Sequence, residues 1–323
     1  MKKYIPIALA VSGAYLLYRE YIHAIDYIYR LCLCRGSKAF LFNCNNISNE
    51  LNTLFLMKDE IENVKRWCAE VKPKKVYIRG ASGRNVYLRV FGHKESRRWA
   101  VAVHGYGCNG RSMLACAKKL YEGGYNVVVP DLPCHGGSGG SVTGLGQYEH
   151  KDIIKIARRI AENDSFADIM LYGVSMGAAT VLMASGSDEL PENVSCIISD
   201  CSFTAAKDIF SFQISGMFRV PTALIINSLD KMYRKRTGLS FKDADAVHCV
   251  SRSKTPILFI HGSKDNIVPT YMVYELYNAA SCPKEIEIIK GAGHGVSAYI
   301  DSKNYWKRVF DFADEHKKAF ESF

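Results

Sequence analysis

The sequence predicts an α/β fold in which a mostly parallel sheet of roughly eight strands carries helices on both faces, together with a helical cap. Three observations lead to this prediction. Short β-branched and aromatic runs follow one another from residue 74, strand-like and helix-like segments then alternate, and one long segment interrupts that alternation. Strands that pass into strand–helix alternation are typical of parallel sheets covered on both faces.

The predicted strands are short runs bounded by turn residues. The first three, "KKVYIRG", "NVYLRVFG" and "WAVAVHG", are separated by "ASGR" and "HKESRR", which is a strand–turn pattern. Later strands are predicted at "YNVVVP", "DIMLYG", "VSCIISD", "TPILFIHG" and "EIEIIKG". Helices are expected between and after them, near 111–122 and 146–162, from Ser175, at 270–279 and from about 302.

The α/β domain is predicted to cover residues 74–323, with a cap inserted at about 202–253. About fifty residues between two sheet strands exceed what a simple crossover needs, and this segment is aromatic and partly helical, so we expect a lid or cap. Residues 31–73 are predicted to be a helical connector. No internal repeat or low-complexity tract is found.

Residues 1–30 form an N-terminal hydrophobic segment. Lys2 and Lys3 precede an uncharged stretch that runs from Tyr4 to Tyr18. About twenty apolar residues are needed to span a bilayer, so this stretch suffices only if its tyrosines lie at the interface and Arg19 extends to it. We expect an uncleaved membrane anchor, with a cleaved signal peptide or a soluble amphipathic helix as alternatives. The side of the membrane stays open, because the lysines place the domain outside while the cysteines favour a reducing compartment.

Composition argues against several kinds of partner. The net charge is +10, but no compact basic patch with interleaved aromatic residues is found. The basic runs "KPKK" (72–75) and "KMYRKR" (231–236) are short and lie far apart, so nucleic-acid binding is not favoured. The eleven cysteines are scattered, and the one close pair, Cys32 and Cys34, has no second pair to complete a zinc site. Most of the cysteines are expected to be buried reduced thiols, and no metal site is predicted.

Ser175 is the candidate nucleophile. It lies in "GVSMG", which fits the pattern Gly-x-Ser-x-Gly, after the predicted strand "IMLY" and before a helix rich in small residues. A sharp strand–turn–helix connection holds such a serine in a strained backbone conformation with its hydroxyl exposed. Gly173 and Gly177 are needed where neighbouring chains approach closely, and the small residues after Met176 let the helix pack close to the sheet.

A serine nucleophile needs a base and an orienting carboxylate, which on this kind of sheet follow it in the order Asp or Glu, then His. Of the four later histidines, His294 lies in the glycine-flanked loop "KGAGHGV" after a strand. His261 and His316 are more easily structural, and His248 lies in the expected cap.

Two aspartates compete for the role of the orienting carboxylate. Asp265 lies in the loop after the next-to-last strand, in "FIHGSKDNIVP", and Asp200 ends the preceding strand. Both are expected at the carboxyl edge of the sheet, where active sites of open α/β sheets form. We favour Asp265, because its turn suits a carboxylate presented to a neighbouring loop.

An acyl-transfer site also needs donors for the oxyanion that develops on the carbonyl. The amide of Met176, directly after the nucleophile, is one candidate. The second is the amide of Tyr106 in "VHGYGCNG", a loop that follows an earlier strand. His104 and Gly105 are expected to shape that loop.

With these motifs in order, the chain resembles the α/β-hydrolase superfamily, specifically bacterial serine hydrolases of the S33-peptidase-like or BEM46-like kind. The matching motifs are "HGYG", "DLPCHGGSGG", "GVSMG", "HGSKDNIVP" and "GAGHG", over roughly residues 74–320. The resemblance implies Ser175 as nucleophile, His294 as base and Asp265 as acid, with Tyr106 and Met176 as oxyanion donors. "DLPCHGGSGG" departs slightly from the commoner form of its loop at Cys134 and His135.

The reaction that follows is hydrolysis of an ester, thioester or amide of an acyl substrate through an acyl-enzyme, most simply by a carboxylesterase-like enzyme. An aminopeptidase-like amidase is the alternative within the same chemistry. A non-catalytic, membrane-tethered binding protein on a hydrolase fold is the alternative outside it. The substrate is expected to be a small molecule or a peptide, and this chemistry requires no cofactor.

Overall fold

The computed structural model describes residues 5–36, 61–93, 95–217 and 222–318 of the chain. They contain one sheet of eight strands in the order β1-β2-β4-β3-β5-β6-β7-β8. β2 pairs antiparallel with both of its neighbours, and all other pairings are parallel. The strands are β1 (Lys74–Arg79), β2 (Asn85–Phe91), β3 (Arg98–Val103), β4 (Asn126–Asp131), β5 (Asp168–Val174), β6 (Val194–Asp200), β7 (Ile257–Gly262) and β8 (Lys284–Ile289). The predicted mostly parallel, eight-stranded α/β fold is confirmed.

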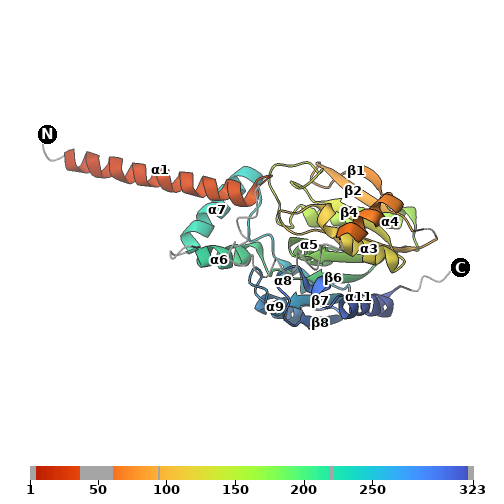
Figure 1. Cartoon of the computed structure of the whole chain (residues 1–323). Helices are drawn as coiled ribbons and strands as arrows, with labels where there is room; N and C mark the ends of the chain where they lie inside the picture. Colours follow the sequence, from red (N-terminus) through yellow and green to blue (C-terminus); the bar gives the residue numbers. More distant parts are fainter. Residues whose placement is uncertain (1–4, 37–60, 94, 218–221, 319–323) are drawn as a thin grey trace.

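Helices cover both faces of the sheet (Figure 1). Side chains alternate along a strand, so Val101 and Val103 of β3 enter one core while Ala100 and Ala102 enter the other. The first core is closed by α4 (Glu149–Asn163), α5 (Met176–Ser185), α8 (Ala246–Val250) and α9 (Tyr271–Ala279). The second is closed by α3 (Leu114–Glu122) and α11 (Ser302–His316). Shorter elements are η2 (Gly110–Met113), α10 (Ser297–Ile300) and a helix over 61–70.

In the described part of the segment expected to form the cap, three helices have two different roles. α6 (Ala206–Met217) and α7 (Thr222–Thr237) pack against each other at the end of the molecule where α1 lies (Figure 1). α8 packs instead on α5 and α9, within the helical layer that covers the sheet. The helices that can act as a cap are therefore α6 and α7.

The N-terminal helix α1 (Ile5–Leu33) runs beside α7, and its first half projects from the body of the molecule (Figure 1). The Tyr21 hydroxyl donates to Ser228 Oγ at 2.8 Å, and Arg236 pairs with Asp26 at 2.5 Å. Towards its end the helix enters the core, where Leu33 is fully buried. The second half of α1 is thus packed as part of the α/β domain.

A transmembrane helix was expected in this N-terminal segment, and the structure does not support it. Among the described residues, no helix combines the length and the apolar character that crossing a bilayer requires. α1 is long enough, with 29 residues, but from Arg19 onward it carries charged side chains at Glu20, Asp26 and Arg30. Much of the predicted connector, residues 37–60, lies outside the described residues.

Candidate active site

Ser175 is held in a strained conformation between β5 and α5. Its φ is 57° and its ψ is −120°, values that a residue with a side chain rarely adopts. A Cβ on Gly173 would lie 2.4 Å from the Gly177 carbonyl oxygen, and one on Gly177 would lie 2.1 Å from the Val103 carbonyl oxygen. Both glycines are therefore required for the turn to pack, as the sequence indicated. The Ser175 amide donates to the Asp200 carbonyl at 2.8 Å, which ties the turn to β6.

The loops after β7 and β8 are bound to each other and carry the other two predicted residues. A Cβ on Gly262 would lie 2.4 Å from the Ala292 carbonyl oxygen, so the two backbones touch where β7 ends. The Lys264 amide donates to the same oxygen at 2.9 Å. This contact brings the Asp265 loop against the His294 loop, although 29 residues separate the two side chains.

The structure places Ser175, His294 and Asp265 in one hydrogen-bonded chain. His294 Nε2 lies 2.8 Å from Ser175 Oγ, and His294 Nδ1 lies 2.7 Å from Asp265 Oδ2. Since a carboxylate only accepts, Nδ1 carries the proton, and Nε2 of the neutral ring is left to accept the serine proton. This is the geometry that activates a serine hydroxyl.

Asp265 is fixed on both of its oxygens. Oδ1 accepts the amides of Ile267 and Val268 at 2.9 and 2.8 Å, which leaves Oδ2 for His294. A second imidazole, that of His261, places Nε2 3.3 Å from the same Oδ2. Burial alone would raise the pKa of Asp265, but His294, His261 and the hydrogen bonds from them hold it well below the usual value. The carboxyl group stays ionised and can orient His294.

Asp200, the rival carboxylate, accepts a hydrogen bond from a residue of α11. It is almost fully buried, and its Oδ2 accepts the hydroxyl of Tyr305 at 2.9 Å. Complete burial raises the pKa of Asp200 to about 6. Tyr305 in turn shares a hydrogen bond of 2.7 Å with Tyr172, so Asp200 belongs to a buried polar chain that joins β6 to α11.

The three other candidate histidines lie in places that suit structural roles. His261 Nε2 lies 2.8 Å from the Val268 carbonyl oxygen and also contacts Asp265, so it stabilises the loop that carries Asp265. His316 packs edge-on against Phe312 at the end of α11. His248 is exposed on α8. Of the four, only His294 is bonded to the serine.

The predicted oxyanion residues flank Ser175. Met176 is the first residue of α5, and the first amides of a helix have no acceptor within it and lie at its positive end. Tyr106 follows Gly105, whose backbone presses on the serine: a Cβ there would lie 3.2 Å from Ser175 Cβ. The Tyr106 ring is buried, and its hydroxyl donates to the Cys32 carbonyl at the end of α1. The side chain of Tyr106 therefore anchors its loop to the end of α1.

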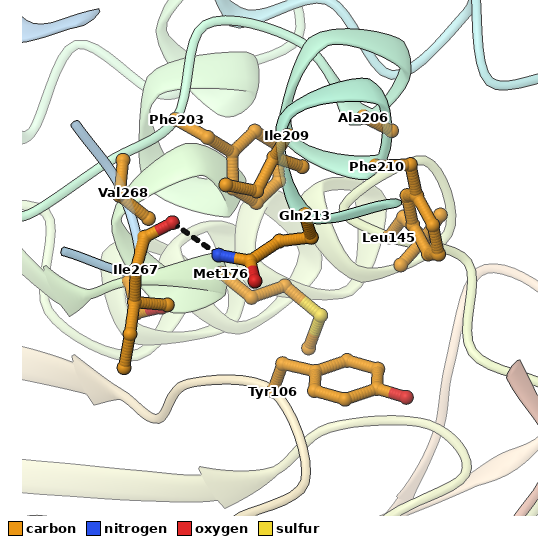
Figure 2. A pocket seen from close by; sticks show the side chains of 11 residues that line it. Tyr106, Leu145, Met176, Phe203, Ala206, Ile209, Phe210, Gln213, Ile267 and Val268 are labelled. Atoms are coloured by element: carbon orange, nitrogen blue, oxygen red, sulfur yellow. Dashed lines mark hydrogen bonds between the residues drawn. The ribbon is translucent and has the colours of Figure 1, made fainter. Parts of the chain in front are cut away.

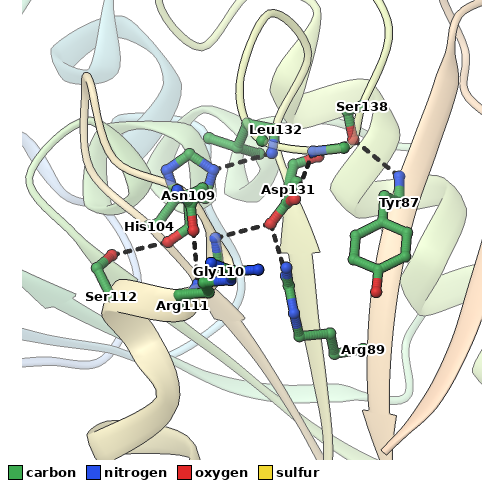
Figure 3. A network of polar contacts seen from close by, with 12 residues as sticks. Tyr87, Arg89, His104, Asn109, Gly110, Arg111, Ser112, Asp131, Leu132 and Ser138 are labelled. Carbon is green, nitrogen blue, oxygen red and sulfur yellow. Dashed lines mark hydrogen bonds and ion pairs between the residues drawn. The ribbon is translucent and has the colours of Figure 1, made fainter. Parts of the chain in front are cut away.

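A buried polar network around Asp131 also holds the loop that carries Tyr106 (Figure 3). Asp131, at the end of β4, accepts Arg89 at 2.7 Å and the amides of Gly110 and Gly137 at 2.8 and 2.7 Å. Burial would raise the pKa of Asp131, but Arg89 and these amides lower it below the usual value. His104 Nε2 accepts the Leu132 amide at 2.9 Å, and burial lowers the pKa of His104 to about 3, so the ring is neutral.

Sequence reasoning did not find the Arg89–Asp131 pair or the contact between His261 and Asp265. One sequence signal was present for Asp131, because a carboxylate that ends the apolar run "VVVP" needs a partner when it is buried. The partner lies on a different strand, 42 residues earlier in the chain. The antiparallel pairing of β2 with β4 sets Tyr87 opposite Asp131, and Arg89 lies two residues further along β2 on the same face of the sheet.

One group of ligand-type side chains lies beside the serine. The ligand atoms of Cys201, Asp265 and His294 lie within 4.8 Å of one another. Asp265 and His294 are already hydrogen-bonded to each other, and burial raises the pKa of the Cys201 thiol well above its usual value. Since the thiolate is the metal-binding form, this cluster is poorly prepared for a metal ion.

Comparison with known proteins places the chain in a family. The family model described as the prolyl oligopeptidase family matches residues 112–319, which include Ser175, Asp265 and His294. The chain belongs to the prolyl oligopeptidase family. Among curated relatives, protein YqkD of Bacillus subtilis is 25% identical over 222 residues, 68% of this chain and 72% of that protein. Protein YfhR of Escherichia coli K12 is 25% identical over 66% of this chain and 69% of that protein.

Solved structures agree with this member of the prolyl oligopeptidase family in fold. An esterase of Pyrococcus furiosus covers 77% of this chain and 94% of its own, with 19% identity and a TM-score of 0.63. Acetyl xylan esterase 1 of a Thermoanaerobacterium species covers 75% of this chain and 83% of its own, with 18% identity and a TM-score of 0.56. The α/β-hydrolase superfamily is confirmed, and the finer S33-peptidase-like or BEM46-like subtype is not.

Proposed function

We propose that this prolyl oligopeptidase family member is a serine hydrolase of the carboxylesterase type, which cleaves an acyl ester through an acyl-enzyme. The observation that carries the proposal is the chain of two hydrogen bonds, 2.8 and 2.7 Å long, from Ser175 through His294 to Asp265. The esterases among the structural neighbours agree with it in fold.

In the proposed reaction, His294 Nε2 takes the proton of Ser175 as Oγ attacks the acyl carbonyl carbon. The charge that develops on the carbonyl oxygen is stabilised by the amides of Met176 and Tyr106. The tetrahedral intermediate collapses, His294 returns the proton to the leaving oxygen, and the alcohol departs. Water then attacks the acyl-enzyme with His294 again as base, which releases the acid and restores the serine.

Asp265 keeps the imidazole in the tautomer that these steps need. Its Oδ2 holds the proton on Nδ1, and its negative charge stabilises the imidazolium that forms when His294 is protonated. The low pKa of Asp265 ensures that this charge is present at neutral pH.

An aminopeptidase-like amidase is the second candidate, and the match to the prolyl oligopeptidase family favours it. The same groups would serve, with His294 protonating an amine instead of an alcohol. Short- and long-chain nitrophenyl esters should be compared with aminoacyl nitroanilides. The proposal expects the higher kcat/KM for esters, and a clear preference for the amides would replace it by the second candidate.

The test of the proposal as a whole is labelling with a fluorophosphonate probe, which reacts with activated serines. The wild-type protein should be labelled and Ser175→Ala should not. The matched control is Ser199→Ala, which alters a buried serine on the neighbouring strand β6 and should leave labelling unchanged. A wild-type protein that resists the probe would favour the non-catalytic binding protein.

A further inference from the structure

A small cavity lies directly beside Ser175, under the helix α6 (Figure 2). Its volume is about 40 Å³, and most of its wall is apolar, with Leu145, Phe203, Ile209 and Phe210 among the lining side chains. Such a volume holds on the order of three water molecules. The cavity therefore suits a short chain of a few heavy atoms.

The position of the cavity indicates which half of a substrate would enter it. Ser175, Met176 and Tyr106 line it, so it opens at the nucleophile and between the two proposed oxyanion donors. His294 does not line it. Since the leaving group must depart beside His294 to receive its proton, the cavity lies on the side of the acyl group.

The wall of this cavity contains a buried polar side chain, that of Gln213 on α6. Gln213 is 6% exposed, and its Nε2 donates to the Ile267 carbonyl oxygen at 2.6 Å. A carbonyl oxygen only accepts, so this bond fixes which end of the amide is the nitrogen. Figure 2 shows the Gln213 oxygen on the side of Met176 and Tyr106. Among the described residues this Oε1 accepts no hydrogen bond.

We propose that Gln213 is a specificity-determining residue that selects acyl groups with a hydrogen-bond donor near the end of a short chain, such as a hydroxyl or an amide N–H. This inference rests on the proposed function. An apolar acyl group would remove water from Oε1 and leave it unpaired, whereas a donor would restore the bond. A pocket that pairs a substrate donor discriminates against the analogue that lacks it.

The experiment uses two esters of equal length. Nitrophenyl butyrate ends in a methyl group, and nitrophenyl 3-hydroxypropionate has a hydroxyl in its place. For the wild-type enzyme, kcat/KM should favour the hydroxy ester by roughly ten- to a hundredfold, after correction for the hydroxide-catalysed rates of the two esters. In Gln213→Leu the corrected ratio should fall to near one, chiefly because butyrate is cleaved faster. Phe212→Leu alters an exposed neighbour on α6 and should keep the wild-type ratio.

The ratio separates this role from a structural one. If Gln213 only ties α6 to the loop of Ile267, the variant loses activity on both esters equally and the ratio is unchanged, which overturns the inference. A wild-type preference for butyrate overturns it without any variant, and Gln213→Met serves if the leucine variant does not fold. If the wild type cleaves neither ester and also resists the fluorophosphonate probe, the proposed function fails and this inference falls with it.

Discussion

Replacing Arg89 with methionine would test how the loop of Tyr106 is held. The Arg89–Asp131 pair is buried, with side chains 12% and 1% exposed, and its 2.7 Å bond is one of three that Asp131 accepts. Arg89→Met leaves a buried carboxylate with two amide partners, a change that costs about 3–5 kcal/mol. Since domains are stable by about 5–15 kcal/mol, the loss is a large share of the total.

The pH dependence of this loss can be worked out. Arg89 and the amides keep the folded-state pKa of Asp131 below its unfolded value, so the stability they give is present above about pH 4 and is lost as the pH falls through the folded pKa. In Arg89→Met burial prevails and the pKa of Asp131 rises, so the variant takes up its proton at a higher pH than the wild type. The difference in unfolding free energy between the two proteins should therefore shrink on acidification.

The assay is urea unfolding of both proteins at pH 7 and pH 5, followed by circular dichroism. Arg252→Met is the matched control, because Arg252 is exposed and lies 3.7 Å from an exposed Asp188, a surface pair worth about 1 kcal/mol or less. Ester turnover should fall in folded Arg89→Met as well, since Asp131 holds both Gly110 and Gly137. A loss below about 1 kcal/mol, or a difference that does not change with pH, would refute the reasoning.

Other residues of the site lead to three more expected outcomes. Asp265→Asn should lower ester turnover about ten thousandfold with little change in Tm, because the amide cannot hold the proton on His294 Nδ1; near-normal turnover would exclude Asp265 as the orienting group. Gly177→Ala should abolish soluble expression, because its Cβ would lie 2.1 Å from a backbone oxygen, and a normal Tm would contradict that packing. Burial lowers the pKa of His104 to about 3, so below about pH 6.5 the unfolded chain binds one proton more than the folded protein, and the free energy of unfolding falls by up to about 1.4 kcal/mol per pH unit. In His104→Gln the free energy of unfolding, measured in urea, should therefore fall less steeply between pH 6 and pH 4 than in the wild type. Equal slopes in the two proteins would show that His104 is not the cause.

Much of the fold could be predicted because its signals are local. Each strand is a short apolar or β-branched run bounded by turn residues, and all eight runs chosen from the sequence are strands. Ser175 could be predicted for the same reason, since the strand, the two glycines and the small-residue helix are contiguous. His294 and Asp265 required one further argument, that the carboxyl ends of parallel strands meet at one edge.

What could not be predicted depends on contacts across the chain. Gln213 resembles any polar residue of an amphipathic helix until α6 is placed over the serine. The N-terminal helix looked separable because the uncharged stretch from Tyr4 to Tyr18 resembles an anchor. Its docking depends instead on partners about two hundred residues away, such as Ser228 and Arg236. No local pattern carries that information.

The docking of α1 has a practical consequence for anyone who shortens this protein. A chain begun at Lys74, where the first strand starts, would lose Leu33 and Tyr29 from the core and would leave the Tyr106 hydroxyl without its acceptor at Cys32. The Arg35 amide and the Leu33 carbonyl, which bond the loop at 141–143, would go with them. Removing the first helix to ease purification would therefore expose part of the hydrophobic core of the α/β domain and break hydrogen bonds to two of its loops. Poor activity of such a fragment would say little about the intact protein.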